Sequence, residues 1–337
     1  MTCRRRSKDD FMCKVGCHTK ALPLNRGKCR GKNGNGTKGV NHAKWCFSGI
    51  SNDDYHAGPG VSKSGLDLIY EQSPLHYWSK YLDPEREPRK ETPALKLGQA
   101  LHTAILEPDE FDNRYIVVPE DAPRRPSITQ VNAKKPSDDT LYAIGWWSDF
   151  DQEHEGKVIL SQEDSSMVLK VSTNARNHPL ARNILSVGEA EQSVFWTDEE
   201  TGVLCKCRPD WLIDPNPNYA VLDLKSALDA SPRGFERSAY NYGYHRAAAW
   251  YLDGVEAATG NRPDAFMFLA VEKEPPYAVA YYYADDAMIE LGRRECREAL
   301  RTYAECLSSG KWPGYADRLL PLGLPRWAQG ALDGFGQ

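Results

Sequence analysis

The sequence lacks any apolar run that approaches the roughly 18 consecutive residues of a membrane-spanning helix. It also lacks the apolar core of a secretion signal, because its first residues are basic and polar. We therefore expect a soluble protein of the cytoplasm that has no membrane partner. The 337 residues, 41% of them hydrophobic, suffice for one large domain with its own core.

A net positive charge is missing as well, since the formal charge is −5. Residues 1–48 carry twelve Lys and Arg against two acids, which leaves the remainder of the chain strongly acidic. A body of this kind does not bind nucleic acid by bulk charge. Contact with phosphate would require a local basic lining, or metal ions that bridge carboxylates to phosphate.

The nine cysteines are an odd number, and no secretion signal accompanies them. This favours reduced thiols over a disulfide framework. Residues 1–48 lack apolar periodicity, so we expect a disordered basic leader followed by a single domain over residues 49–337. A zinc site within the leader is the alternative, and its candidate ligands are Cys13, Cys17, His18, Cys29 and Cys46.

Apolar periodicity predicts helices first, then strands that alternate with helices. Helices are expected over 62–70, from Ser73, over 93–106, 140–152, 161–173, 178–186, 232–258 and 285–308. Strands are expected over 189–197 and 203–213 as a hairpin, over 219–225, and over 265–271 and 277–283 as a second hairpin. This order predicts an α/β fold with a mixed central sheet flanked by helices.

The chemically informative spacing is Asp210-x12-Asp223-x-Lys225. Because side chains alternate along a strand, Asp223 and Lys225 share one face while Leu222 and Leu224 face the other way. A mixed sheet can bring Asp210 beside Asp223. Two neighbouring carboxylates repel each other unless a cation lies between them, and their hard oxygen atoms suit Mg²⁺ or Mn²⁺.

Such a site fits the hydrolysis of a phosphodiester. A metal lowers the pKa of a bound water and neutralises charge that develops on the phosphate, and Lys225 can orient the water. The alternative is an ordinary Asp/Lys pair at the surface of a strand. The strand around Asp223 and Lys225 is otherwise apolar, however, and unpaired charges are costly there.

These residues resemble the PD-(D/E)xK nuclease signature, carried by CRPD at 207–210 and LDLK at 222–225. The run LGQALHTAILEP at 97–108 is similar to the histidine motif of the RecB-like branch. Residues 52–69 and the WPGY run at 312–315 are similar to the catalytic domain of RecE-type exodeoxyribonuclease VIII. The resemblance covers about residues 50–330.

The resemblance implies a restriction-endonuclease-like core and a nuclease that digests one strand of duplex DNA from its 5′ end. It leaves 3′ single-stranded overhangs for annealing-type recombination. The implied catalytic residues are Asp210, Asp223 and Lys225. Two Mg²⁺ ions, for which Mn²⁺ can substitute, would be held by His102, Glu191, Asp210, Asp223 and the Leu224 carbonyl. From the residues alone, His102 reads as a core histidine and Glu191 equally well as a solvated edge residue.

The implied partners are the ends of double-stranded DNA, further copies of the chain in a tetrameric ring, and a RecT-like single-strand annealing protein. One departure from the family concerns the helix after Lys225, where Ala247 replaces an expected glutamine. His245 and Arg246, together with the retained Tyr251, are the alternative groups for holding a DNA backbone.

Two other functions stay open at this stage: a structure-specific or restriction-type endonuclease of the same fold, and a DNA-end-binding protein without catalysis. Trp146-Trp147 and Tyr281–Tyr283 could stack on bases, although such aromatic groups more often belong to a core. Cys205 and Cys207 are expected to pack in the interior. Only Cys296 and Cys306 follow late in the chain, which disfavours an iron–sulfur cluster of three late cysteines.

Overall fold

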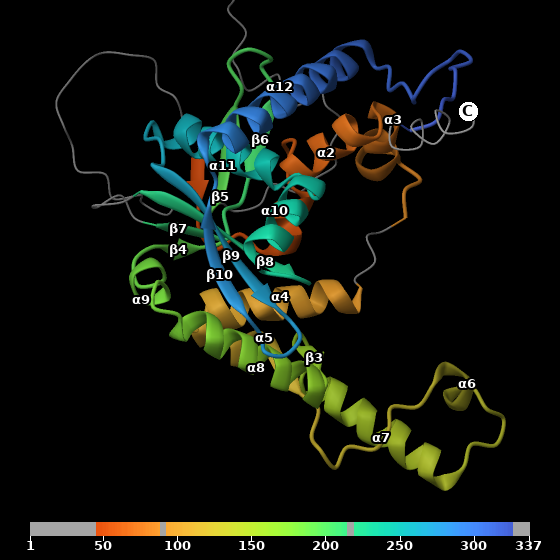
Figure 1. Cartoon of the computed structure of the whole chain (residues 1–337). Coiled ribbons are helices and arrows are strands. Elements are labelled where there is room, and N and C mark those ends of the chain that lie inside the picture. The colour runs from red at the N-terminus through yellow and green to blue at the C-terminus, as the bar shows by residue number, and fades with distance from the viewer. Residues whose placement is uncertain (1–44, 88–91, 214–218, 326–337) are drawn as a thin grey trace, which may run out of the picture. The chain divides into compact units, whose positions relative to one another are not determined.

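The computed structural model describes residues 45–87, 92–213 and 219–325, which belong to one compact unit (Figure 1). Its five-stranded sheet has the order β10-β9-β8-β7-β4, and a three-stranded sheet has the order β1-β5-β6. Strands β2 and β3 form a parallel pair. The strands are β1 (Trp45–Phe47), β2 (Tyr115–Val117), β3 (Val158–Leu160), β4 (Glu189–Ala190), β5 (Ser193–Thr197), β6 (Leu204–Cys207), β7 (Trp211–Ile213), β8 (Ala220–Ala227), β9 (Ala265–Glu272) and β10 (Val279–Tyr283).

Helices precede, interrupt and follow these strands. They are α1 (Asn52–Ala57), α2 (Lys63–Glu71), α3 (Pro74–Tyr77), α4 (Pro93–Leu106), α5 (Phe111–Arg114), α6 (Ile128–Val131), α7 (Asp138–Glu153), α8 (Gln162–Asn177), α9 (Ala181–Ile184), α10 (Pro232–Asn241), α11 (Tyr244–Thr259) and α12 (Asp286–Ser309), with a π-helical turn η2 (Trp78–Leu82) and a 3-10 turn η3 (Pro108–Glu110). No helix within the described ranges is long and apolar enough to cross a membrane.

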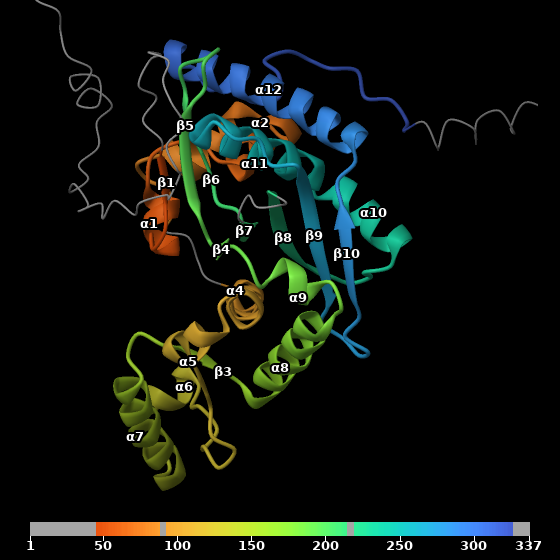
Figure 2. The same cartoon turned by 90° about the vertical axis from the view of Figure 1, so that its left-hand side faces the viewer.

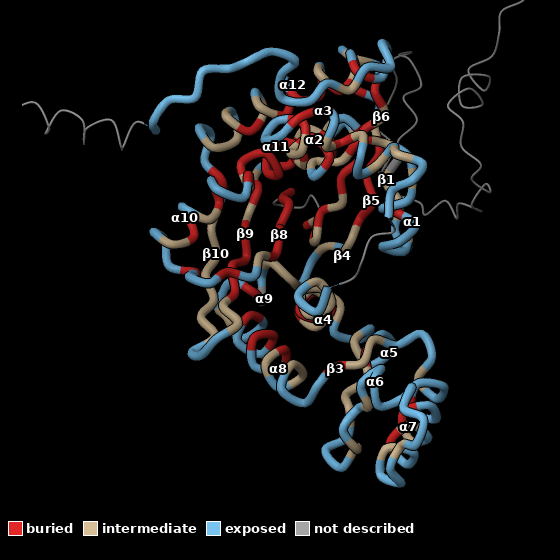
Figure 3. Tube along the Cα trace, turned by 90° about the vertical axis from the view of Figure 1, so that its right-hand side faces the viewer, coloured by how far each residue is buried: buried red, intermediate tan, exposed pale blue. Residues whose placement is uncertain are grey.

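The five-stranded sheet is mixed, because β8 runs parallel to β9 and antiparallel to β7. Alternate residues of β8 enter two different cores. Val221 and Ala227 pack with α2, α10, α11 and α12, whereas Leu222 and Leu224 pack with α4 and α8. Figure 2 shows these two groups of helices on opposite sides of β8 and β9, and Figure 3 shows that both strands are buried. The predicted α/β class, with a mixed sheet flanked by helices, is confirmed.

The two strands expected over 189–197 and 203–213 are each divided into two, which corrects the single hairpin. β5 pairs with β6 in the three-stranded sheet, whereas β4 pairs with β7 in the five-stranded sheet. Glu191 interrupts the first strand with a left-handed φ of 52°. Pro209 interrupts the second strand, since proline cannot donate to a strand ladder. The interruption leaves Asp210 on the connection between the two sheets.

Three helix and boundary expectations also differ from the structure. The single helix expected over 232–258 is α10 followed by α11, separated at Gly243, whose φ is +63°. The helix expected over 178–186 is confined to the single turn α9. Residues 45–47 form β1 against β5 rather than the end of a disordered leader. Residues 1–44 lie outside the described ranges, and with them four of the five candidate zinc ligands.

Candidate active site

The central strand β8 positions Asp223 and Lys225 on the face that α10 and α11 cover. Asp223 is 1% exposed, and the Lys225 ammonium forms an ion pair with its Oδ2 atom. The same ammonium lies 3.5 Å from the Leu224 carbonyl oxygen and 5.4 Å from the centre of the Tyr244 ring. The charged pair is thus enclosed between the sheet and the first turn of α11, as the alternation of the strand predicts.

Asp210 reaches the same place from the connection between β6 and β7. Its Oδ2 accepts a hydrogen bond of 2.7 Å from the Leu224 amide, and it lies 3.2 Å from His102 Nε2. His102 projects from α4, and its Nδ1 donates to the Gly98 carbonyl at 2.9 Å. That bond turns Nε2 toward the carboxylate. The structure therefore brings together the four residues that the sequence motifs single out, although they come from three separate segments.

Glu191 lies beside this group, at the point where the strand is interrupted after β4. Its amide donates to the Asp210 carbonyl at 3.1 Å, and its carboxylate lies 2.7 Å from Arg208 Nε. Arg208 also donates to the Ile50 carbonyl at 2.9 Å and lies over the Tyr55 ring. Arg208 holds the Glu191 side chain and was not identified from the sequence, although its position beside Pro209-Asp210 was a usable signal.

The pKa values of these acids indicate where negative charge is poorly tolerated. Burial and the neighbouring Asp210 charge raise the pKa of Glu191 to about 7. Burial also raises the pKa of Asp223 to about 6, despite the opposing Lys225 charge. Burial would lower the pKa of His102, but the Asp210 carboxylate outweighs it and raises that pKa to about 9. Asp210 is the exception, since the His102 charge outweighs burial and lowers its pKa.

The donor atoms of this site fit a divalent cation chemically. Carboxylate oxygens, an imidazole nitrogen and the Leu224 carbonyl are the ligands that hard divalent ions accept. Asp223 Oδ2 is buried and faces the positively charged Lys225 ammonium, which is consistent with a position that accepts a cation. Within the described ranges, no three His, Cys, Asp or Glu side chains are already arranged around a common metal position. Lys225 pairs with Asp223, and His102 pairs with Asp210.

The residues expected to hold DNA are placed differently. His245 and Arg246 are 3% and 4% exposed. The Arg246 guanidinium lies 2.7 Å from Asp67 and 2.7 Å from Glu295 and also contacts Glu71, while His245 Nε2 lies 2.7 Å from Glu295. We call these five residues the Arg246 cluster. It joins α2, α11 and α12, and its closed ion pairs argue against a direct contact of His245 or Arg246 with a DNA backbone.

The rest of α11 lies against the site or against α12. Burial and the Asp223 charge raise the pKa of Tyr251, which places its hydroxyl near the carboxylates. Ala247, at the position of the missing glutamine, is 4% exposed. On the other side of the helix, Gly292 of α12 approaches so closely that a Cβ atom there would lie 2.0 Å from the His245 carbonyl oxygen. The acids of the Arg246 cluster gave no sequence signal.

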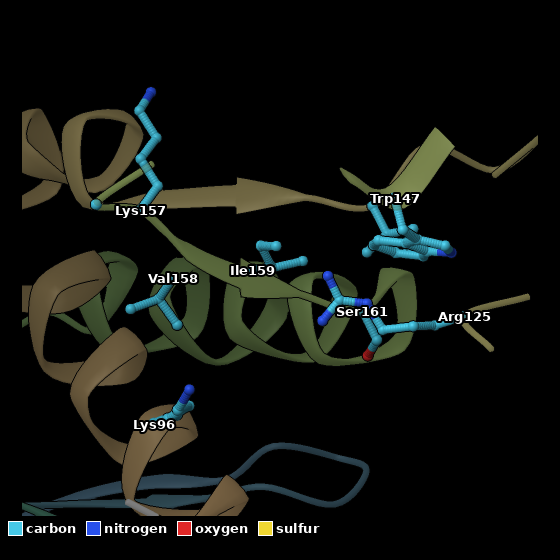
Figure 4. Close-up of a pocket in the computed structure, with 9 residues that line it drawn as sticks. Lys96, Arg125, Trp147, Lys157, Val158, Ile159 and Ser161 are labelled. Atoms are coloured by element: carbon cyan, nitrogen blue, oxygen red, sulfur yellow. The ribbon is translucent and has the colours of Figure 1, made fainter. Parts of the chain in front are cut away.

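Other candidates lie outside the site. Trp147 is 8% exposed, and the Tyr282 ring stacks on Phe235 at 5.0 Å, so both are packed rather than presented to a ligand. Cys205, Cys207, Cys296 and Cys306 are buried. A hollow of about 540 Å³ is lined by Lys96, Val118, Arg125, Trp147, Gly156, Lys157, Val158, Ile159 and Ser161 (Figure 4). It shares no residue with the carboxylate site.

Three solved structures that match parts of this chain illustrate the range of similarity. A candidate exonuclease from Eubacterium rectale is 13% identical, with a TM-score of 0.52 over 85% of this chain and 99% of that protein. A phage-related exonuclease from Haemophilus somnus is 12% identical, with a TM-score of 0.28 over 56% and 92%. An alkaline exonuclease from Laribacter hongkongensis is 15% identical, with a TM-score of 0.24 over 63% and 97%. Only the first is close enough to support the fold.

The mixed sheet, the paired aspartates at its centre and the adjoining lysine define a nuclease domain of the PD-(D/E)xK class. The chain belongs to a family of PDDEXK-like domains of unknown function, whose model matches residues 64–319. No protein of curated function matches it significantly. The predicted superfamily and the predicted class of enzyme are confirmed, and the RecE-type assignment stays a prediction. Nucleases of this class generally use divalent metal ions.

Proposed function

We propose that the protein is a Mg²⁺-dependent 5′→3′ exodeoxyribonuclease that degrades one strand of linear duplex DNA and leaves 3′ overhangs. The observation that carries this proposal is the convergence of Asp210, Asp223, Lys225 and His102 in a PD-(D/E)xK fold. The RecE-like motifs support the polarity and the duplex substrate. The Eubacterium rectale protein of the same fold is itself described as a candidate exonuclease.

In this proposal Asp210, Asp223 and the Leu224 carbonyl hold a divalent ion, with His102 and Glu191 available for a second one. Bound metal supplies an activated water and neutralises charge on the scissile phosphate. The charges of Asp223 and Asp210 outweigh burial and raise the pKa of Lys225, so its amine stays protonated. Lys225 then acts as a hydrogen-bond donor and a positive charge that orients the water and stabilises the transition state.

The chain would act on DNA ends as an oligomer, and the RecE-like resemblance suggests a tetrameric ring. The strongly acidic composition after residue 48 supports enclosure of the duplex over tight electrostatic binding. A RecT-like annealing protein is the proposed recipient of the 3′ single strand. Recombination by annealing is thus the proposed setting of the reaction.

The test uses linear duplex DNA labelled separately at its 5′ and 3′ ends, with a closed circular duplex of the same sequence alongside. We expect Mg²⁺ or Mn²⁺ to release the 5′ label first and to leave the circle intact. Ca²⁺ is expected to support binding without turnover, and EDTA to stop the reaction. Cutting of the circle would replace the proposal with an endonuclease, whereas binding of ends without cleavage in any metal would indicate a DNA-end-binding protein.

A further inference from the structure

An exposed aromatic ring stands at the turn between α10 and α11, beside the carboxylate site. Tyr242 ends α10, and its side chain is 64% exposed, although a tyrosine ring usually gains free energy by burial. The next residue, Gly243, starts α11 in a left-handed conformation. The turn therefore presents the Tyr242 ring to solvent at the point where the chain enters the site.

Two ring contacts connect this exposed side chain to Lys225. The Tyr242 and Tyr244 rings are stacked, with their centres 5.9 Å apart and their planes inclined by 29°. The Tyr244 ring lies over the Lys225 ammonium and is itself stacked on the buried Phe268 at 5.9 Å. Tyr244 is thus anchored in the core, and Tyr242 extends the aromatic surface outward from the catalytic lysine.

The turn that carries Tyr242 contacts Lys63 and the Arg246 cluster. Lys63 of α2 donates to the Tyr242 carbonyl at 3.2 Å and pairs with Asp67 at 2.7 Å. A Cβ atom at Gly243 would lie 2.1 Å from Arg246 Nη2, so the guanidinium fills the space directly beneath the turn. Because three acids fix that guanidinium, the position of the turn is set before any ligand arrives. The Arg246 side chain therefore packs against the turn that carries Tyr242.

We infer that Tyr242 is a stacking platform for one nucleobase beside the scissile phosphate. The inference rests on the proposed nuclease function and names how that site holds its substrate. An exposed aromatic ring binds the flat face of any base, whereas Lys225 would contact the phosphate directly and the carboxylates would do so through a bound divalent cation. The ligand is an unpaired nucleotide at the end of the strand being cut, and the contact tolerates all four bases.

The experiment compares Tyr242→Ala, Tyr242→Phe and Tyr242→Trp with the wild-type protein. The matched control is Tyr142→Ala, since Tyr142 is similarly exposed, at 66%, but lies in α7. The substrates are linear duplexes with a normal base, or an abasic nucleotide, at each of the two positions that flank the first scissile phosphate. Steady-state kcat and KM are measured for each pair, and circular dichroism monitors folding.

We expect Tyr242→Ala to lower kcat/KM about tenfold on the normal substrate, whereas Tyr242→Phe, Tyr242→Trp and the Tyr142→Ala control stay within about twofold. The wild-type protein should lose a similar factor on an abasic substrate at one of the two positions. Tyr242→Ala should lose little more there, because the contact is already absent. If Tyr242→Ala lowered kcat/KM relative to the wild-type protein by the same factor on normal and abasic substrates, the stacking role would be overturned.

A binding measurement separates this inference from the proposed function. DNA that carries 2-aminopurine at the sensitive position should lose fluorescence when wild-type protein binds in Ca²⁺, and should lose less with Tyr242→Ala. Such quenching without cleavage in Mg²⁺ would contradict the nuclease and keep the stacking site. Cleavage without any difference in quenching would do the reverse. Light scattering measures the mass of the Tyr242→Ala protein. If that mass changed while the difference in kcat/KM between normal and abasic substrates stayed as in the wild-type protein, the ring would form a contact between copies and the inference would be overturned.

Discussion

The molecule buries charge in two places, and the two places differ in how that charge is balanced. In the carboxylate site, burial raises the pKa values of Asp223 and Glu191. In the Arg246 cluster, hydrogen bonds from Arg246 and His245 outweigh burial and lower the pKa of Glu295. Asp223 and Glu191 resist ionisation, and an added cation would stabilise their charged forms. Glu295 is already satisfied by the protein.

Burial of charge alone therefore does not identify a catalytic site. Both groups lie in the same domain and both contact α11, yet only one has carboxylates whose charge the protein leaves poorly compensated. Perturbed acids that face a common point favour function, whereas closed ion pairs favour structure.

The largest difference should appear in catalysis. Asp223→Asn and Lys225→Ala should each lower the cleavage rate at least about a thousandfold, since each removes a group that acts on the transition state. Rates come from single-turnover digestion of labelled duplex. Asp286→Asn, at an exposed acid in the first turn of α12, is the control. A near-normal rate for Lys225→Ala would show that another strand carries the chemistry.

A smaller but still large difference should appear in stability. Arg246→Met should lower the free energy of unfolding by about 3–5 kcal/mol, because it leaves buried acids without their cation. Arg293→Met is the matched control on the neighbouring helix, where the pair with Asp253 is about one-third exposed. That change should cost about 0–1 kcal/mol. Urea denaturation measures both. Equal costs for the two variants would contradict a structural role for the Arg246 cluster.

The smallest effect concerns pH, and the two groups should have opposite signs. The folded protein keeps a proton on Asp223 that the unfolded chain releases, so Asp223 lowers stability as pH rises from 3.8 toward about 6. Glu295 has a lowered pKa, so its contribution is present above 4.5 and is lost as pH falls below it. Denaturation in EDTA across pH 4–7 tests this. Asp223→Asn should remove the first trend and Glu295→Gln the second. Slopes altered in the same direction would show that the two groups titrate alike.

Much of the fold could be predicted because its signals are local. The apolar run around Asp223 and Lys225 identified a buried strand, and its alternation gave the faces of both side chains. The periodicity and flanking prolines of 93–106 gave the bounds of α4, which match the structure. The residues of the candidate site followed from motifs of the same local kind.

The remainder depends on contacts that no local pattern contains. Glu191 and Pro209 divide their strands between two sheets, and the two interruptions span only two and three residues. Gly243 interrupts a helical pattern that is otherwise continuous, because it adopts a left-handed φ of +63° and its missing Cβ leaves room for the Arg246 side chain. The partners of Arg246 are 175 and 179 residues away in α2 and 49 residues away in α12, so a basic side chain that reads as a DNA contact is instead an internal one.

Helix α12 approaches α11 closely at Gly292 because glycine has no Cβ atom there. The distance between the two helices therefore depends on this single residue. Any side chain at position 292 would collide with the His245 carbonyl and push the two helices apart. Glu295 lies one turn further along α12, so the displacement would weaken its ion pair with Arg246. The turn that carries Tyr242 would then lose part of its support. Gly292→Ala would thus alter the proposed contact of Tyr242 with a nucleobase, although position 292 lies in a helix that carries none of the proposed catalytic residues.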